Sequence, residues 1–426
     1  MRPGPAEPRR PAETSPPGRP PGRVGAGFIA LYALAFTASC LMLIAPLLVT
    51  LALKVGDLVG AEEAPGRLAL TLAAGSFVAL FANPLSGRLS DRTTSRFGMR
   101  RPWMLLGLAG GTVGITTIAY APTFAVVVVG WCVAQVFFNA LLAVQVAVLP
   151  DQVPAAQRGM VSGVLGVCVP VASVCGTYLV NAFSPNTVAM FLGPVAVGAA
   201  FIVLFAAVLP DRRLISGTPP RWSWREFAGT FYVSPRRHRD FARVFLSRFL
   251  FVMAFAFLTS FQVYYLLADL GSSQGRVPHQ VFVATLVSSA GVVVASLLGG
   301  KLSDRWGRRR VFVLVATVVY AVAMLIVGLA GDFSTFLFGV AVSGVGFGVY
   351  VAVDLALVTQ VLPSAADTAK DMGVFNIANA LPYSVAPAVA PAILAVSGGR
   401  YWALFAFAGA CALASALVVS RVRSVR

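Results

Sequence analysis

The sequence predicts an all-α membrane protein of about twelve transmembrane helices in two six-helix halves. Three observations carry this prediction: an apolar composition, a succession of long apolar segments, and a motif that recurs half a chain later. Hydrophobic residues make up 58% of the 426 residues and charged residues 12%, about half the charged share of an average soluble chain. Because so little polar material cannot cover a soluble globule, we expect lipid to solvate much of the surface.

Twelve apolar segments are long enough to cross about 30 Å of hydrocarbon. The predicted spans are Phe28–Leu53, Leu68–Leu89, Trp103–Tyr120, Phe124–Leu149, Met160–Asn181, Val188–Leu209, Val244–Ala268, Val281–Leu302, Val311–Ala330, Phe333–Leu362, Met372–Val396 and Trp402–Ser420. Residues 1–25 are rich in Pro, Gly and Arg, and we expect them to form a disordered cytoplasmic tail. The first span is too long for the core of a cleavable signal.

The charges predict the orientation of the chain. Of the 33 Lys and Arg residues, 28 fall in segments that lie inside if the N-terminus is inside, and 4 fall in outer segments. Since cytoplasmic loops collect basic residues, we expect a multi-pass protein of the plasma (inner) membrane with both termini in the cytoplasm. This bias explains the net charge of +17 without a nucleic-acid partner, and nothing in the sequence requires more than a monomer.

A repeat divides the chain. The segment Gly87–Arg92 (GRLSDR) recurs as Gly300–Arg305 (GKLSDR), and the same offset of 213 relates Leu149–Pro150 to Leu362–Pro363. Each motif follows the second predicted helix of its half. A duplicated six-helix unit is typical of secondary transporters whose halves rock around a central site.

The predicted domains follow from this repeat and from the longest internal loop. They are an N-terminal bundle over 26–210, a cytoplasmic central loop over 211–243, a C-terminal bundle over 244–420 and a short cytoplasmic tail over 421–426.

The two Gly-x-Leu-Ser-Asp-Arg loops resemble the loop signature of the major facilitator superfamily, and residues 25–420 fit its organisation. The resemblance implies the major facilitator fold and transport by alternating access. It also implies a gate that latches the halves on the cytoplasmic side, where charges near helix ends are favourable. The gate residues are then Gly87, Asp91, Arg92, Arg101, Gly300, Asp304 and Arg305. The alternative is that these charges only set the orientation of the helices in the membrane.

A finer resemblance points to one branch. Ser90–Pro102 is similar to the corresponding loop of the glycoside-pentoside-hexuronide cation symporters and the sucrose-proton symporters, and Leu149–Pro154 and Asp354–Pro363 are similar to bacterial members. This implies sugar or glycoside transport. The fourth helix departs from the pattern, because Ala134 and Gln145 stand where sucrose symporters carry an acidic residue and an arginine.

Two charged residues lie clearly inside predicted spans, away from the span ends: Arg248 in the seventh and Asp354 in the tenth. An ionisable group in a span costs at least about 2.5 kcal/mol, so each is a candidate site residue. Their predicted depths differ by about one helical turn, which allows them to pair. A protonatable aspartate beside an arginine is a means of coupling proton movement to opening; a permanent structural ion pair is the alternative.

Uncharged polar residues in the spans are candidates for lining a cavity, because amides beside aromatic rings suit hydroxylated ligands. The candidates are Gln135, Asn139, Gln145, Gln262, Tyr350, Asn376 and Asn379. The four-residue spacing of Gln135 and Asn139 places them on one helix face. The alternative for any single one is a hydrogen bond that only joins two helices.

The sequence offers no catalytic or metal-binding constellation. His238 and His279 fall in predicted loops on opposite sides, no phosphate-binding GxxxxGK[ST] motif occurs, and the five cysteines have no CxxC spacing. We therefore predict no enzyme, no metal and no cofactor.

Three functions remain open. The first is proton- or cation-coupled transport of a sugar-like or other small polar solute across the lipid bilayer. The second is a drug or metabolite exporter of the same fold, and the third is a membrane sensor that binds a ligand without moving it.

Overall fold

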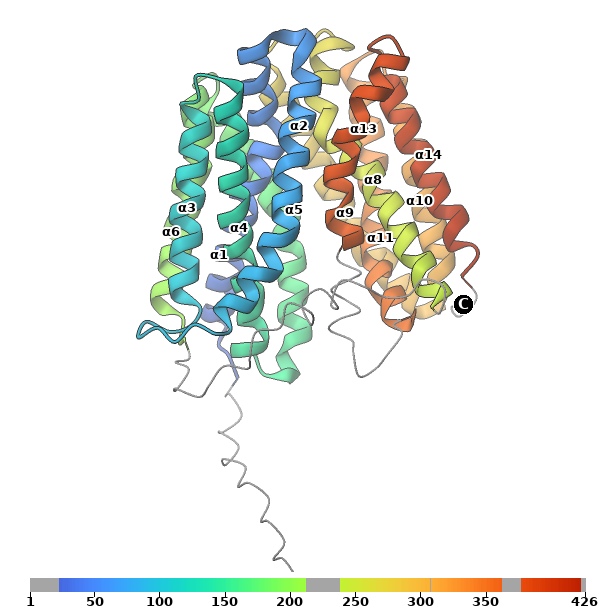
Figure 1. The fold of residues 1–426 in the computed structure, drawn as a ribbon. Coiled ribbons are helices and arrows are strands. Elements are labelled where there is room, and N and C mark those ends of the chain that lie inside the picture. The colour runs from blue at the N-terminus through green and yellow to red at the C-terminus, as the bar shows by residue number, and fades with distance from the viewer. Residues whose placement is uncertain (1–22, 212–237, 307, 362–376, 423–426) are drawn as a thin grey trace, which may run out of the picture.

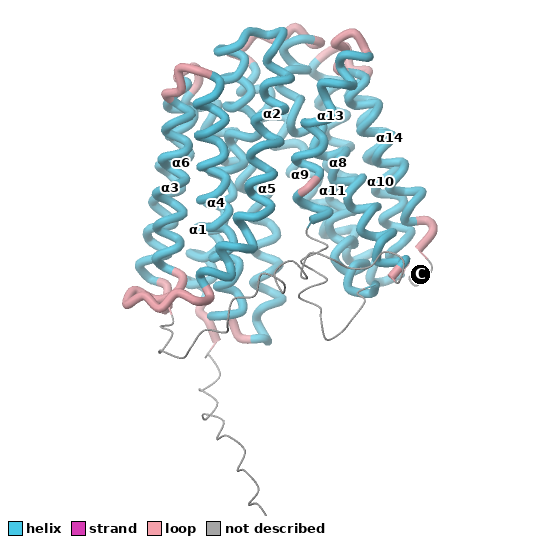
Figure 2. The backbone as a smooth tube through the Cα atoms, viewed as in Figure 1, coloured by secondary structure: helices cyan, strands magenta, loops and turns pink. Residues whose placement is uncertain are grey.

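The computed structural model describes residues 23–211, 238–306, 308–361 and 377–422, in which all regular structure is helical (Figures 1 and 2). The helices of the first half are α1 (Ala26–Ala45), the π-helix η1 (Pro46–Thr50), α2 (Leu51–Ser90), α3 (Arg101–Ala119), α4 (Phe124–Gln152), α5 (Ala155–Phe183) and α6 (Thr187–Val208). Those of the second half are α8 (Arg239–Ala268), α9 (Val277–Trp306), α10 (Arg309–Gly328), α11 (Phe333–Val361), α13 (Pro382–Val396) and α14 (Trp402–Val419).

The first stretch of helix reverses direction at Gly60. Ala26–Ser90 is 65 residues long, and a straight helix of that length would measure about 98 Å, three times the bilayer core. Gly60 breaks it with φ 80° and ψ 165°, a conformation open to glycine because it lacks a Cβ. This stretch is one of eleven described helical stretches long and apolar enough to span a membrane, and the reversal lets it cross twice.

Some helices continue beyond the predicted membrane spans. The predicted outer loop at 54–67 is helical on both sides of Gly60, and α8 begins at Arg239, five residues before the predicted Val244. A span predicted from hydropathy stops where charged residues begin. The backbone hydrogen bonds of the helix do not depend on hydropathy, so the helix can extend beyond the apolar segment into the membrane–water interface. Most of the predicted central loop, residues 212–237, lies outside the described residues.

The packing of the helices repeats between the halves. In the first half α2 and α3 both pack on α4, while α1 packs on α5 and α6. In the second half α9 and α10 both pack on α11, while α8 packs on α13 and α14. The sequence repeat therefore reflects two bundles of the same architecture. These bundles stand side by side in Figure 1, with the described chain ends at one end of the molecule. We call this the inner end, because it is predicted to be cytoplasmic.

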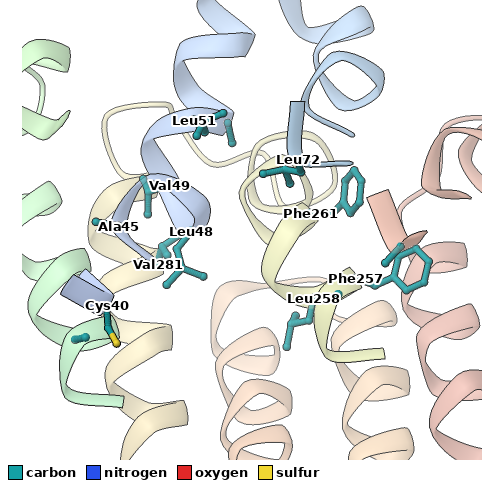
Figure 3. Close-up of a cluster of buried hydrophobic side chains, with 14 of the residues drawn as sticks. Cys40, Ala45, Leu48, Val49, Leu51, Leu72, Phe257, Leu258, Phe261 and Val281 are labelled. Atoms are coloured by element: carbon teal, nitrogen blue, oxygen red, sulfur yellow. The ribbon is translucent and has the colours of Figure 1, made fainter. Parts of the chain in front are cut away.

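The bundles meet along a seam that is closed by apolar side chains toward its outer end. Helix α2 packs on α13, α5 packs on α9, and η1 and α2 contact α8. Figure 3 shows buried residues from η1, α2, α8 and α9 in this region, which we call the outer seal: Leu48, Val49, Leu51, Leu72, Leu258, Phe261 and Val281. Two hydrogen bonds cross the seam nearby, from the Tyr264 hydroxyl to the Ala52 carbonyl at 3.0 Å and from the Gln274 amide to the Asp57 carboxylate.

Toward the inner end the bundles diverge (Figure 1). Helices α5 and α9 touch through Tyr178 and Phe282, whose ring centroids lie 5.6 Å apart, yet they are the least buried of the candidate spans. A Cβ added at Gly159, Gly163 or Gly166 of α5 would meet no atom within 4 Å. The described conformation is thus closed at the outer end and spread at the inner end.

Within each bundle, glycines allow some helices to touch backbone to backbone. A Cβ at Gly114 of α3 would lie 2.5 Å from the Ala134 nitrogen and 2.7 Å from the Gly130 oxygen of α4. In the second half, a Cβ at Gly344 of α11 would lie 2.4 Å from the Ser288 oxygen of α9. Membrane helices rely on such close approaches, because burial from lipid gives little hydrophobic drive.

We predict that Gly114→Ala lowers the stability of the protein by about 1–3 kcal/mol, because the added methyl group must push two backbones apart. The midpoint of thermal denaturation in detergent measures this. Gly166→Ala is the matched control, since open space surrounds that position and alanine is the better helix former. Equal midpoints for the two variants would contradict the prediction.

Candidate functional site

The two predicted intramembrane charges form an ion pair. Arg248 of α8 donates through Nη1 to Oδ2 of Asp354 on α11, which confirms the predicted pairing. A second guanidinium nitrogen, Nη2, lies 3.4 Å from the side-chain oxygen of Asn379. An ionised group away from water needs such partners, because an unpaired buried charge is strongly destabilising.

Aromatic rings continue the contact between α8 and α11. Phe251 stacks on Tyr350 with ring centroids 3.8 Å apart, and one turn further Phe255 stacks on Phe347 at 4.2 Å. The Tyr350 side chain also lies close enough to the Asp354 carboxylate to interact with it. Along the two antiparallel helices, the ion pair is thus followed by two stacked aromatic pairs. The rings of the second pair, Phe255 and Phe347, remain partly exposed.

The ion pair lies near the seam. Tyr383 of α13, one turn after Asn379, is close enough to Arg248 to be influenced by its charge. The Tyr383 carbonyl accepts a hydrogen bond of 3.3 Å from Ser76 of α2, in the other half. Asn379 and Tyr383 therefore connect the pair to the first half.

Two predicted amides lie together on α4 in the first half. The Asn139 amide donates to the Gln135 side-chain oxygen at 2.7 Å, so these residues share a face of α4 as predicted. Gln135 also packs on α2, because a Cβ at Gly75 would lie 3.1 Å from its Cγ. Gly75 precedes Ser76, so the amide pair lies beside the contact between α2 and α13.

The other predicted polar residues are not seen beside the Arg248–Asp354 pair. Gln145 is fully buried inside the first bundle. Its side-chain amide donates to the Ala35 carbonyl at 3.3 Å, and its main-chain carbonyl accepts a hydrogen bond of 2.6 Å from the Tyr32 hydroxyl. It fastens α4 to α1. Gln262 is buried near the outer end of α8, and Asn376 lies outside the described residues.

A residue outside the predicted gate organises the inner end of the first bundle. The buried Arg100 guanidinium contacts Asp91 at 2.6 Å and Asp151 at 2.8 Å, and it donates to the Ser90 hydroxyl. We call these four residues the inner network. Arg100 stands among five basic residues of one loop, and nothing in the sequence distinguishes it from its neighbours.

Arg101, a predicted gate residue, acts within the first bundle. Its guanidinium donates to the Leu209 carbonyl, which gives a hydrogen-bond partner to a carbonyl at the end of α6. The Asp211 carboxylate accepts the backbone N–H groups of Arg100 and Arg101 at 2.7 and 2.8 Å, which caps α3. These contacts fix the end of α6 to the start of α3.

The remaining gate candidates stay predictions. Gly87 and Gly300 lie within α2 and α9, Arg92 is partly buried, and Arg305 is exposed at the end of α9. The side chain of Asp304 lies outside the described part of the chain.

We predict that Arg100→Gln lowers the free energy of unfolding by about 2 kcal/mol, because it removes the charge-assisted hydrogen bonds of a buried guanidinium with the exposed Asp91 and the partly buried Asp151. Thermal denaturation in detergent is the measurement. Arg96→Gln in the same loop is the control and should change little, because Arg96 is exposed and only covers the Phe97 ring. A similar loss in both variants would contradict the special role of Arg100.

The family model described as Major Facilitator Superfamily matches residues 27–274 and 244–426, and so covers both bundles. The chain belongs to the major facilitator superfamily. Its members are transporters rather than enzymes, and this agrees with the helical fold and the repeated packing described above.

Curated relatives within this superfamily differ in their cargo. The chain is 31% identical over 181 residues to the class G tetracycline resistance protein of Vibrio anguillarum, an alignment that covers 41% of this chain and 43% of the relative. It is 31% identical over 125 residues to the multidrug resistance protein MdtL of Klebsiella pneumoniae, covering 29% of each. It is also 31% identical over 100 residues to plastidic glucose transporter 4 of Arabidopsis thaliana, covering 24% of this chain and 18% of the relative. The aligned region is less than half the length of each relative.

Solved structures share the fold over nearly the whole chain. The nucleoside transporter NupG superimposes with a TM-score of 0.74 at 14% identity, covering 93% of this chain and 99% of NupG. A bacterial homologue of the human lysosomal transporter Spinster, described as inward-facing and unoccupied, gives a TM-score of 0.63 at 15% identity and covers 93% and 95% of the two chains. At these identities the likeness shows the fold alone.

Proposed function

We propose that this superfamily member is a secondary active transporter that moves a sugar-like or other small polar solute by alternating access, coupled to a proton or another cation. The observation that carries the proposal is the Arg248–Asp354 ion pair, flanked by Asn379 near the seam. Intramembrane ionisable pairs of this kind are typical of proton and substrate pathways.

The geometry supports a coupling step. When Asp354 accepts a proton it can no longer hold Arg248 by charge, and the contact between α8 and α11 weakens. Since Asn379 and Tyr383 link Arg248 to α13, and α13 contacts α2, this change reaches the surface on which the halves move. Protonation and the opening of the seam are therefore coupled.

A second candidate is export of an apolar drug or metabolite. The stacked rings of Phe255 and Phe347 favour a flat apolar ligand, and two of the curated relatives are named for resistance to drugs. A protein that binds its ligand without flux is a further outcome, in which the fold acts as a sensor.

We further propose that the protein acts as a monomer in the plasma membrane with both termini in the cytoplasm. The excess of basic residues at the inner end supports this orientation. In that orientation the described conformation opens toward the cytoplasm.

We predict that proteoliposomes containing the protein accumulate a labelled sugar or glycoside when an inward proton gradient is imposed, and that Asp354→Asn abolishes the gradient-driven part. The measurement is uptake of a panel of such solutes with and without the gradient. Asp240→Asn is the control, because Asp240 pairs with Arg243 near the inner end of the same helix. Absence of uptake of every solute by folded protein would contradict solute import.

We also predict that the outer seal must part during each cycle. Cysteines placed at Asp57 and Gln274, in a chain whose own cysteines are replaced, should be joined by a short bifunctional maleimide, because these side chains touch across the seam. Cross-linked protein should lose uptake, and each single-cysteine variant should keep it after the same treatment. Undiminished uptake by cross-linked protein would rule out opening at this end.

A further inference from the structure

A small cavity crosses the seam at the outer end of the molecule, and we call it the outer-seam pocket. Its volume is about 210 Å³. Its lining includes Thr50, Asp57, Ser184 and Thr187 of the first half and Gln274 and Gly275 of the second. The hydrogen bond from the Gln274 amide to the Asp57 carboxylate joins the two halves in its wall. Because both halves build the pocket, it is complete only while the outer end is closed.

Thr50 brings a buried hydroxyl to the wall that has no hydrogen-bond partner in the described part of the chain. The hydroxyl of a helical threonine commonly donates to the carbonyl four residues earlier, as Thr71 does to Arg67 at 2.9 Å. Thr50 instead ends the π-helix η1, where the carbonyl four residues before it, that of Pro46, accepts from the Leu51 N–H. Single π-turns of this kind are frequent at functional sites.

The burial of Thr50 makes a ligand partner favourable. The residue is 1% exposed, and a buried hydroxyl without a partner costs free energy. A molecule in the outer-seam pocket that forms a hydrogen bond with this hydroxyl recovers that cost. Ser184 and Thr187 add two half-buried hydroxyls to the same wall.

The charges around the outer-seam pocket favour a cation. Of the described residues that line it, only Asp57 is charged. The basic residues next to its lining segments bond elsewhere, since Lys54 donates to the Ala119 carbonyl at 3.3 Å and Arg276 to the Ser273 hydroxyl at 3.2 Å. Hydroxyl and carboxylate oxygens both accept hydrogen bonds. The pocket therefore presents several acceptors around one negative charge.

The volume limits the size of the ligand. Drug-sized ligands occupy sites of roughly 300–1,000 Å³, which is larger than this pocket. At about 30 Å³ for each water molecule in the liquid, the pocket corresponds to about seven water molecules. It therefore suits a molecule of only a few non-hydrogen atoms.

We propose that the outer-seam pocket binds a small organic ammonium ion from the outer side, and that this ligand holds the outer end closed. The site is separate from the Arg248–Asp354 pair, and binding to it does not depend on which solute is transported. The ammonium group donates charge-assisted hydrogen bonds to Asp57, and a hydroxyl of the ligand pairs with that of Thr50. A ligand that needs both halves binds the closed conformation alone, so it shifts the protein toward that conformation.

The first test compares three small molecules of similar size and different charge: ethanolamine, ethylene glycol and glycolate. Purified protein in an amine-free buffer with detergent is titrated with each at constant ionic strength, and binding is followed by calorimetry and thermal stabilisation. Ethanolamine should bind about tenfold or more tightly than ethylene glycol, because its ammonium group meets a carboxylate. Glycolate should bind most weakly. Equal binding of the three, no binding of ethanolamine, or an equal response to sodium chloride overturns the proposal.

Variants test the two residues that carry the argument. Asp57→Asn should lose the preference for ethanolamine over ethylene glycol. Thr50→Val should bind ethanolamine about fivefold more weakly, yet keep the denaturation midpoint of the ligand-free protein, because the hydroxyl that it loses has no partner in the chain. Glu62→Gln and Thr71→Val are the matched controls, because neither residue lines the pocket. Wild-type affinity in both Asp57→Asn and Thr50→Val overturns the proposal.

A labelling experiment tests whether the ligand holds the outer end closed. Val281→Cys places a cysteine in the outer seal of a chain whose own cysteines are replaced, and its reaction with a maleimide reports opening. Ethanolamine should slow this reaction severalfold, ethylene glycol should not, and Asp57→Asn should remove the effect. Gly163→Cys on α5, toward the spread inner end, should react at the same rate with and without ethanolamine. An unchanged rate at Val281→Cys in protein that binds ethanolamine overturns the closing role. Neither experiment requires a transported solute, so both outcomes are independent of the proposed function.

Discussion

The two bundles of this protein are held together toward the outer end of the seam, where α2 packs on α13, α5 packs on α9, and η1 and α2 meet α8. In lipid such a contact gains little from the hydrophobic effect, because hydrocarbon tails solvate apolar side chains as well as leucine does. Its stability comes from close packing and from a few hydrogen bonds, such as that from Tyr264 to Ala52. The divergence of the bundles toward the inner end depends on this contact remaining closed.

Although the two bundles share one architecture, their polar chemistry differs. Helices α1 and α8 begin at residues 26 and 239, which are 213 apart, so Arg248 corresponds to Ala35 in the first half. Ala35 is fully buried, and its carbonyl accepts from Gln145. The first bundle instead places its buried arginine, Arg100, at its inner end. The first bundle is therefore fixed by a network at its inner end, and the second carries its ion pair near the seam.

This asymmetry gives each bundle a separate task. In the first bundle, the contacts of Arg100 and Asp211 tie α2, α3, α4 and the end of α6 into one body. In the second, the Arg248–Asp354 pair joins α8 to α11 at a contact that one proton can weaken. On the proposed function, the first bundle moves as one body against a second bundle whose α8–α11 contact one proton weakens.

The sequence by itself determined the membrane solvent, the order of the spans, the duplication and the two charges, Arg248 and Asp354, that could pair within the membrane. These features depend on composition, on repeats along the chain and on the high cost of an unpaired charge in lipid, all of which are local or pairwise. Only the tertiary structure decided that the chain reverses at Gly60, that Arg100 organises the inner network, and that Gln145 lies in a bundle core away from the seam. Those outcomes depend on which helix packs against each face. Polar residues on apolar helices look alike in sequence, whether they face a neighbouring helix or the space between the halves.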